Sequence, residues 1–427
     1  MIKMNGSPYL LVSDEKGNIF EDTSLRVVGR EGNKVKLLEE KDFILLPDGS
    51  DFFYLPKRKA VGLNPKTGNL EISKKGYAVS AFNAPAYTQT AIAAWIKEKD
   101  APVLPLFAYT AVGWHRGKFY TTALRIDPDI RQDIEQFNQN KVISNTKRFL
   151  KKYPQNRLVK HLVHCATVYF CPAARNYFLE RWEAPLPTSP TCNSRCKGCI
   201  SYQPKDSGFC STQNRITFIP TPEEIAEIAI DHIAKAPNPI VSFGQGCEGE
   251  PLMVADVIAE AIRLIRKKTT HGIINLNTNG SKPEKIQKLI DAGLDSARIS
   301  MNSFLPDRYT WYYSPVNYTY DDVLLSIQAL RQAKKWVSIN YFIHPGYTNH
   351  PNEIAALKNA IKTLKFNMIQ WRNFNIDPDW IDKPLKMEIT KPDIDIKIHI
   401  EQIKKDFPRL YNGYFNPGKE IIDKYNF

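Results

Sequence analysis

The chain has 427 residues, of which 58 are basic and 45 are acidic, so its formal net charge is +13. This length exceeds one ordinary domain, and two domains with extensions are expected. Seven cysteines in a chain of this size exclude a disulfide-stapled secreted scaffold, because such scaffolds are short and rich in cysteine, whereas clustered thiols in a reducing compartment more often serve metals or catalysis.

Charge and apolar segments bear on partners and location. A net charge of +13 fits an electrostatic footprint for RNA or DNA, and it equally fits the lysine-rich composition of heat-adapted proteins. Residues 1–16 contain no apolar stretch long enough for a signal peptide, and the longest charge-free apolar window, 101–114, is too short to span a bilayer. A cytoplasmic protein with no membrane partner is therefore expected.

Residues 1–130 are predicted to form a β-rich domain, because apolar and β-branched runs alternate with turn signals such as "LPDGSD" and "NPKTGN". One helix is expected in it, over residues 88–99. Residues 131–183 are predicted to be a basic, mainly helical connector. Its segment 145–161, "NTKRFLKKYPQNRLVKH", has two interpretations: a nucleic-acid surface, or a solvated linker helix whose aromatic residues face the neighbouring domain.

Residues 184–380 alternate short apolar strands with amphipathic helices, which predicts a parallel sheet with right-handed crossovers. Strands are expected at 184–187, 239–244, 272–280, 296–302, 336–343 and 367–374. Helices are expected at 221–236, 251–268, 282–293, 320–335 and 352–365. The fold class is therefore α/β, an incomplete (βα)6-type barrel whose active site lies at the carboxyl ends of the strands. Residues 381–427 are expected to be a C-terminal extension with one helix that caps the open side.

The loop "PTSPTCNSRCKGCISYQP" after the first predicted strand places Cys192, Cys196 and Cys199 within eight positions. Thiolates select zinc or iron–sulfur centres, but structural zinc sites draw on four ligands, commonly in two pairs. No such pair follows at zinc-like spacing. Three thiols in one loop therefore suit an iron–sulfur cubane whose fourth iron is left for an exchangeable ligand.

This Cys-x3-Cys-x2-Cys loop, placed after the first strand of an α/β barrel, resembles that of the radical S-adenosylmethionine (radical SAM) superfamily. The resemblance implies that Cys192, Cys196 and Cys199 hold a [4Fe–4S] cluster and that S-adenosylmethionine chelates its fourth iron. Gly198 departs from the pattern, since many members of the family place an aromatic residue just before the third cysteine.

A second stretch, "SFGQGCEGEPL", resembles the Gly-Gly-Glu-Pro motif of the same family. Gly249 and Glu250 match the motif, and Glu248 replaces its first glycine. A carboxylate and exposed carbonyls suit the methionine ammonium. By the same resemblance, polar residues at the ends of later strands are expected to contact the cofactor: Asn277, Asn279, Ser300, Asn302 and Arg372.

The resemblance implies an oxygen-sensitive enzyme that reductively cleaves S-adenosylmethionine to a 5′-deoxyadenosyl radical. The radical would act on a small molecule, a cofactor precursor or a peptide, with a low-potential electron donor such as a flavodoxin or ferredoxin. A radical SAM enzyme that modifies RNA is the less favoured alternative, and a zinc-bearing structural protein without catalysis is a second alternative.

Four cysteines lie outside the loop: Cys165, Cys171, Cys210 and Cys247. Their number suits an auxiliary [4Fe–4S] cluster. In the alternative interpretations one of them, such as Cys247, is a catalytic thiol, or all four pack as small apolar side chains.

Two further catalytic candidates, Tyr341 and His344, are expected at the end of the fifth strand, facing the substrate space. A histidine there could act as a base, or it could be a turn partner beside Pro345.

Overall fold

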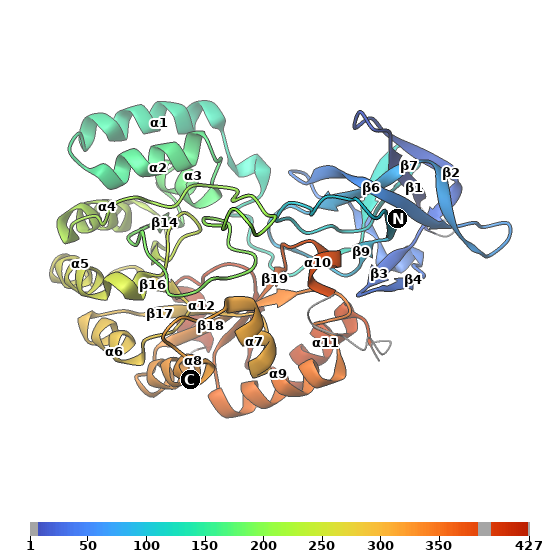
Figure 1. Cartoon of the computed structure of the whole chain (residues 1–427). Helices are drawn as coiled ribbons and strands as arrows, with labels where there is room; N and C mark the ends of the chain where they lie inside the picture. The colour runs from blue at the N-terminus through green and yellow to red at the C-terminus, as the bar shows by residue number, and fades with distance from the viewer. Residues whose placement is uncertain (1–6, 383–393, 426–427) are drawn as a thin grey trace.

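The computed structural model describes residues 7–382 and 394–425. A β-rich part, blue in Figure 1, lies beside an α/β part that runs from green to red. Helices α1 (Gln139–Lys152), α2 (Arg157–Thr167) and α3 (Pro172–Phe178) connect the two parts and pack together at one end of the α/β part in Figure 1.

The N-terminal part consists of antiparallel strands. They are β1 (Tyr9–Ser13), β2 (Ile19–Val27), β3 (Gly29–Glu31), β4 (Lys34–Lys36), β5 (Ile44–Leu45), β6 (Asp51–Leu63), β7 (Leu70–Phe82), β8 (Tyr87–Gln89), β9 (Ile92–Ala93), β10 (Trp95–Lys97), β11 (Val112–His115), β12 (Lys118–Thr121) and β13 (Ala123–Arg125). The largest sheet has the order β10-β6-β2-β1-β11-β12-β5, with β7 paired to both β1 and β6.

The helix predicted over residues 88–99 is wrong. This segment forms β8, β9 and β10, which pair with three different strands, β13, β3 and β6. Residues 91–95 are all buried, so their apolar side chains are packed on every side. Tertiary pairing overrides the local helix propensity of an alanine-rich segment.

The α/β part is built on a parallel sheet with the order β14-β15-β16-β17-β18-β19-β20. Its strands are β14 (Glu183–Pro185), β15 (Ile240–Phe243), β16 (Ile273–Thr278), β17 (Ser296–Met301), β18 (Trp336–Ile343), β19 (Met368–Asn373) and β20 (Tyr411–Gly413). Because neighbouring strands follow in chain order and all pairs are parallel, the sheet is an open barrel, and the predicted fold class is confirmed.

Helices cover the outer side of this sheet in Figure 1. They are α4 (Pro222–Lys235), α5 (Ala255–Lys268), α6 (Pro283–Ala292), α8 (Tyr320–Gln332) and α9 (Pro351–Leu364). A further helix, α7 (Pro306–Tyr313), follows β17 and is not part of this outer layer. The residues at the start of α4 show why a helix begins there. Thr221 accepts a hydrogen bond from the backbone of Glu224, and Glu224 reaches back to the backbone of Thr221, which closes a capping box.

The C-terminal extension adds a strand to the parallel sheet. Beyond α10 (Pro378–Asp382) and α11 (Ile396–Asp406) it supplies β20, which extends the sheet next to β19, and then α12 (Lys419–Tyr425). One helix was expected there, and both α11 and α12 are present. Residues 383–393 of this extension lie outside the described residues.

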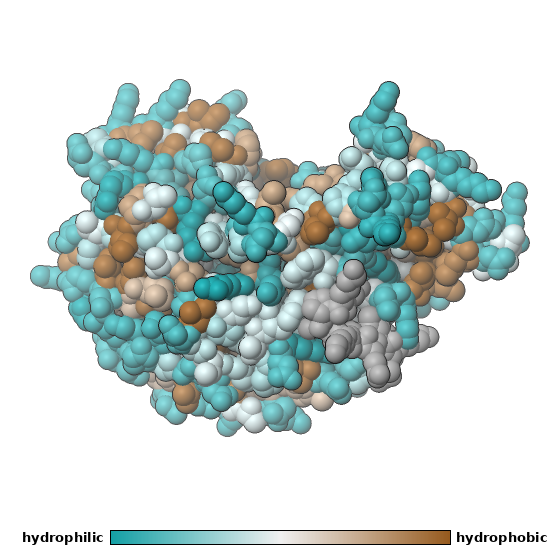
Figure 2. Space-filling view, in the orientation of Figure 1, coloured by the Kyte–Doolittle hydropathy of each residue, from teal (hydrophilic) through white to brown (hydrophobic). Residues whose placement is uncertain are grey.

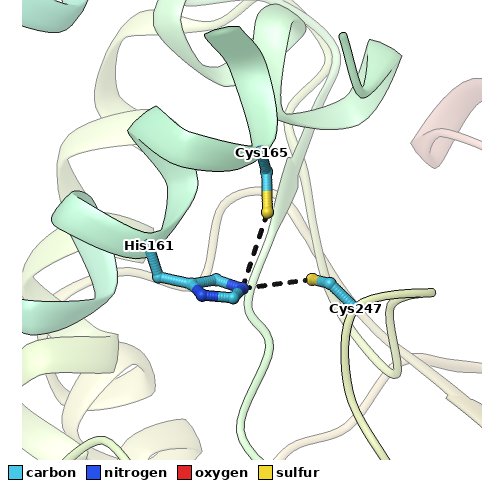
Figure 3. Close-up of side chains that lie close together, drawn as sticks. All are labelled: His161, Cys165 and Cys247. Carbon is cyan, nitrogen blue, oxygen red and sulfur yellow. Dashed lines mark hydrogen bonds between the residues drawn. The ribbon is translucent and has the colours of Figure 1, made fainter. Parts of the chain in front are cut away.

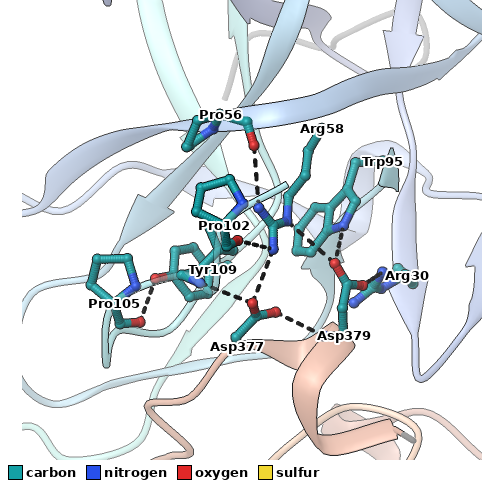
Figure 4. A network of polar contacts seen from close by, with 10 residues as sticks. Arg30, Pro56, Arg58, Trp95, Pro102, Pro105, Tyr109, Asp377 and Asp379 are labelled. Atoms are coloured by element: carbon teal, nitrogen blue, oxygen red, sulfur yellow. Dashed lines mark hydrogen bonds and ion pairs between the residues drawn. The ribbon is translucent and has the colours of Figure 1, made fainter. Parts of the chain in front are cut away.

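A buried ion network joins the N-terminal sheet to α10 (Figure 4). The side chain of Arg58 on β6 is fully buried and donates to Asp377 at 2.9 Å and to Asp379 at 3.3 Å. Asp379 also accepts from Arg30 and from the indole of Trp95. Burial raises the pKa of Asp377, whereas hydrogen bonds and the arginine charges lower that of Asp379. The network fixes the N-terminal part against the end of the barrel.

The molecular surface is mostly hydrophilic on the face shown in Figure 2, with smaller apolar patches over the N-terminal sheet and over the helical layer. Basic side chains of α1 and α2 pair with acids: Lys152 lies 2.6 Å from Asp231, and Arg157 lies 2.7 Å from Glu224. None of the described helices is long and apolar enough to cross a membrane.

Candidate active site

Cys192, Cys196 and Cys199 line one cavity of about 360 Å³ at the carboxyl ends of the parallel strands. Their loop is tied to the segment after β15 by backbone pairing. The N–H of Gly249 donates to the carbonyl of Ser189 at 2.6 Å. A Cβ atom on Gly249 would lie 2.0 Å from the carbonyl oxygen of Thr191, so only glycine permits this contact.

The loop thiols are placed around the cavity rather than against one another. Among the described residues, they are absent from the groups whose donor atoms are close enough to share a single ion. Burial and the charges of neighbouring groups raise the pKa of Cys192 to about 11 and that of Cys196 well above its ordinary value. Cys192 and Cys196 are thus protonated at neutral pH without a cation, and metal binding would release their protons. Donors spread around a cavity fit a polynuclear cluster.

Gly198 marks where this chain departs from the expected aromatic residue. A Cβ atom there would lie 2.8 Å from the hydroxyl oxygen of Tyr312. Tyr312 and Tyr313, both from α7, line the cavity. Aromatic surface next to the third cysteine is therefore supplied by α7, and the small residue in the loop makes room for it.

Glu248 is saturated by hydrogen bonds from the protein. One carboxylate oxygen accepts from the N–H groups of Gly244 and Gln245. The other accepts from the N–H and hydroxyl of Thr188 and from the N–H of Ser189. With these partners the carboxylate joins the segment after β15 to the start of the cysteine loop. Glu248 lines the cavity, but this geometry gives it a positioning role.

Glu250 faces the same cavity and retains capacity for a ligand. It accepts hydrogen bonds from the N–H groups of Leu252 and Asn279 and from the hydroxyl of Thr278. Ionised carboxylates offer about four acceptor positions, so one position stays open. Burial raises its pKa to about 7, and a cationic group placed beside it would favour the carboxylate form.

The predicted polar residues at the strand ends divide into two groups. Asn277, Asn279, Ser300 and Arg372 line the cavity. Asn302 is buried but does not line it among the described residues. The side-chain amide of Asn279 donates to Asn193 and Ser194 of the cysteine loop, so it also fixes that loop. The roles of all five in binding the cofactor stay predictions.

Two arginines line the cavity, and only one of them was expected. Arg298 on β17 lines the cavity together with Arg372 on β19. Burial, and then the charge of Arg372, lowers the pKa of Arg298 to about 9. The Nε atoms of both side chains lack a hydrogen-bond partner among the described residues. Open donors on cationic side chains suit an anion.

Tyr341 does not face the cavity, contrary to expectation. Side chains alternate along β18; Asn340 and Phe342 line the cavity, and Tyr341 points to the other side. There its hydroxyl donates to Glu353 on α9 at 2.8 Å. His344 is 1% exposed and is also absent from the described cavity lining. A catalytic role for either residue thus has no geometric support.

The cysteines outside the loop are brought together in part (Figure 3). Cys165 on α2 and Cys247 after β15 approach each other, and His161, which was not among the predicted residues, lies between them. Cys210 is exposed, and Cys171 lies outside this group. The pKa of Cys165 is lowered to about 5, first by the hydrogen bond from Cys247 and then by His161, and that of Cys247 is raised. Cys247 does not line the cavity among the described residues.

Comparison with known proteins agrees with this geometry. Residues 186–357 match the family model of the Radical SAM superfamily. The chain carries a radical SAM domain. This domain spans the cysteine loop, the Glu250 segment and the strands β15 to β18.

Two curated relatives match a part of this chain. A probable GTP 3′,8-cyclase of Methanococcus aeolicus is 35% identical over 124 residues, which cover 28% of this chain and 37% of the relative. The GTP 3′,8-cyclase of Lactiplantibacillus plantarum is 31% identical over 130 residues, covering 29% and 34%. The matched part thus spans about a third of each relative.

Similar solved structures come from several radical SAM proteins. SuiB of Streptococcus suis bound to S-adenosylmethionine is 14% identical with a TM-score of 0.38, and the match covers 77% of this chain and 74% of SuiB. Methylornithine synthase (PylB) is 16% identical with a TM-score of 0.37, covering 63% and 76%. Likenesses of this size say nothing about the substrate.

Proposed function

We propose that this protein is a radical SAM enzyme in which Cys192, Cys196 and Cys199 hold a [4Fe–4S] cluster and the open iron binds S-adenosylmethionine. When bound, the cluster supplies the electron that splits the sulfonium into methionine and a 5′-deoxyadenosyl radical. The observation that carries the proposal is the cavity lined by all three loop thiols and by Glu250. The remaining acceptor position of Glu250 suits the ammonium of the methionine moiety.

The chain's own residues would orient the cofactor and keep the cavity closed to stray hydrogen donors. Glu248 and Asn279 fix the walls of the cysteine loop through the hydrogen bonds described above. Phe82 and Asn83 bring the N-terminal part to the cavity. We therefore assign the N-terminal part a share in enclosing the substrate.

The substrate is proposed to carry an anionic group, a carboxylate or a phosphate, that binds between Arg298 and Arg372. The two guanidinium groups, whose Nε atoms are buried, repel each other, and an anion between them would remove this repulsion and fill the open Nε donors. A small anionic metabolite or an acidic peptide group fits this requirement. GTP, named in the curated relatives, is one such anion and is a suitable first compound to test.

The proposal is tested by anaerobic reconstitution with iron and sulfide, followed by incubation with dithionite and S-adenosylmethionine. Formation of 5′-deoxyadenosine is expected from the wild-type chain and from a Cys210→Ala control, whose exposed thiol lies away from the cavity. Chains with Cys196→Ala are expected to form none. Equal product formation by Cys196→Ala and wild type would contradict the proposal.

Anionic compounds, GTP among them, would then be screened for stimulation of 5′-deoxyadenosine formation. An active compound is expected to lose its effect in Arg298→Gln while S-adenosylmethionine cleavage without substrate is retained. Stimulation only by neutral or cationic compounds would contradict the assignment of the arginine pair.

A further inference from the structure

His161, Cys165 and Cys247 form a compact group of three donor atoms (Figure 3). The Nε2 atom of His161 lies 3.3 Å from the Sγ atom of Cys247 and 3.5 Å from that of Cys165. All three donor atoms lie within 4.8 Å of one another, and both cysteines are buried. His161 and Cys165 are four residues apart on α2, so they share one face of the helix.

These distances match the ligand spacing around a single tetrahedral ion. Zinc–sulfur bonds of about 2.3 Å and zinc–nitrogen bonds of about 2.0–2.1 Å, at tetrahedral angles, separate a nitrogen from a sulfur ligand by about 3.6 Å. The observed separations are 3.3 and 3.5 Å. A cubane holds its thiolates on different corner irons and would need wider spacing. The group therefore lacks the room that an auxiliary iron–sulfur cluster requires.

We propose that His161, Cys165 and Cys247 bind one Zn²⁺ ion, with a solvent molecule in the fourth position. Thiolate and imidazole are the ligands that zinc prefers. Binding is not a redox step: the thiols lose their protons to solvent as the zinc–sulfur bonds form. This site is separate from the cavity of the loop thiols and does not depend on the function proposed for them.

The ion would join the helical connector to a wall of the cavity. Cys247 directly precedes Glu248, whose carboxylate holds the start of the cysteine loop. The carbonyl of Cys247 accepts a hydrogen bond from the N–H of Ile216 at 2.8 Å. A metal bond from Cys247 to α2 would hold this segment from a third direction.

The test uses the full chain in a background with Cys192, Cys196 and Cys199 all changed to alanine, which removes the ligands of the other centre. After loading with zinc and desalting, elemental analysis is expected to find about one zinc per chain. Adding Cys165→Ala, Cys247→Ala or His161→Ala is expected to lower zinc affinity at least about a hundredfold, more than loss of a residue that only orients a ligand. Adding Cys210→Ala is expected to change nothing.

A second measurement avoids variants that fail to fold. Co²⁺ is loaded into the chain that carries only the three alanine substitutions of the loop cysteines. It is expected to give a thiolate-to-metal charge-transfer band and the intense visible bands of four-coordinate cobalt. Zinc competition should abolish both. Zinc content that is unchanged in Cys165→Ala and Cys247→Ala, an octahedral cobalt spectrum, or formation of a Cys165–Cys247 disulfide in place of metal uptake would overturn the proposal. Because the loop cysteines are absent, none of these outcomes bears on radical chemistry.

Discussion

The two groups of thiols in this protein differ in how their sulfur atoms are spaced. The loop thiols come from one short segment and spread around a cavity, whereas Cys165 and Cys247 are 82 positions apart in the chain and meet within a compact group with His161. Closeness in sequence therefore does not mean closeness in space. Wide spacing around a cavity suits a cluster with an open corner, and close spacing suits one ion.

The largest expected effect comes from the loop thiols. Changing Cys196 to alanine should remove the iron chromophore and reduce 5′-deoxyadenosine formation to background, because a cubane held by two thiolates is labile. Changing Cys247 should remove zinc and leave about four irons per chain. Iron and zinc analysis of both variants checks these two predictions. If the single variant Cys247→Ala lost its iron, the distinction between the two groups would be wrong.

The next largest effect is on stability and should leave both groups intact. Arg58→Met leaves Asp377 buried without its cation, since that arginine is fully buried. Removing one partner of a buried ion pair costs about 3–5 kcal/mol. Urea unfolding monitored by circular dichroism checks this value. Arg263→Met, which removes an exposed pair with Glu260, is the control and should change stability by under about 1 kcal/mol.

A smaller effect is expected from Glu250. Glu250→Gln is isosteric and removes the charge facing the ammonium, and a hydrogen bond to a charged group is worth about 1.5–3 kcal/mol, or roughly 10- to 150-fold in affinity. Because burial raises the pKa of Glu250 to about 7, the affinity for S-adenosylmethionine should also depend on pH. Below that value the wild-type carboxyl is protonated, so binding of S-adenosylmethionine should weaken as the pH falls from 8 to 6.

Equilibrium dialysis with the reconstituted protein at several pH values measures this affinity. The Gln variant should show a flat profile at the lower affinity. Parallel pH profiles for wild type and Glu250→Gln would show that another group contacts the ammonium.

The smallest effect concerns the arginine pair. Arg298→Lys keeps the charge but loses the second donor arm, so it should raise the KM of an anionic substrate by about tenfold while kcat falls less. Steady-state kinetics at saturating S-adenosylmethionine check this split. A fall in kcat alone would place Arg298 at the reacting atoms instead of at the anion.

Much of the barrel could be predicted from sequence because its elements carry local signals. Thr221 and Glu224 form a capping box at the start of α4, and Gly293 ends α6 in the left-handed conformation. These features depend on residues within one turn of each other. The loop thiols stand out by their short spacing in the chain, and the Glu250 segment by its resemblance to a motif of the radical SAM superfamily.

The missed features depend on contacts between distant parts of the chain. β20 has three residues and forms because β19 offers an edge to pair with. His161 lies 86 positions from Cys247, so only its i,i+4 spacing with Cys165 could have drawn attention to it. Arg298 sits inside a strand pattern that looks like ordinary alternation. Its place in the cavity lining becomes apparent only in the folded sheet.

The most direct test is metal analysis of the anaerobically purified, reconstituted wild-type protein, with iron, sulfide and zinc measured on the same sample. We predict about four irons, about four sulfides and about one zinc per chain, with an electron paramagnetic resonance signal of the reduced protein that changes when S-adenosylmethionine is added. About eight irons without zinc, or a spectrum indifferent to S-adenosylmethionine, would contradict the assignment of a cluster to one thiol group and a single ion to the other.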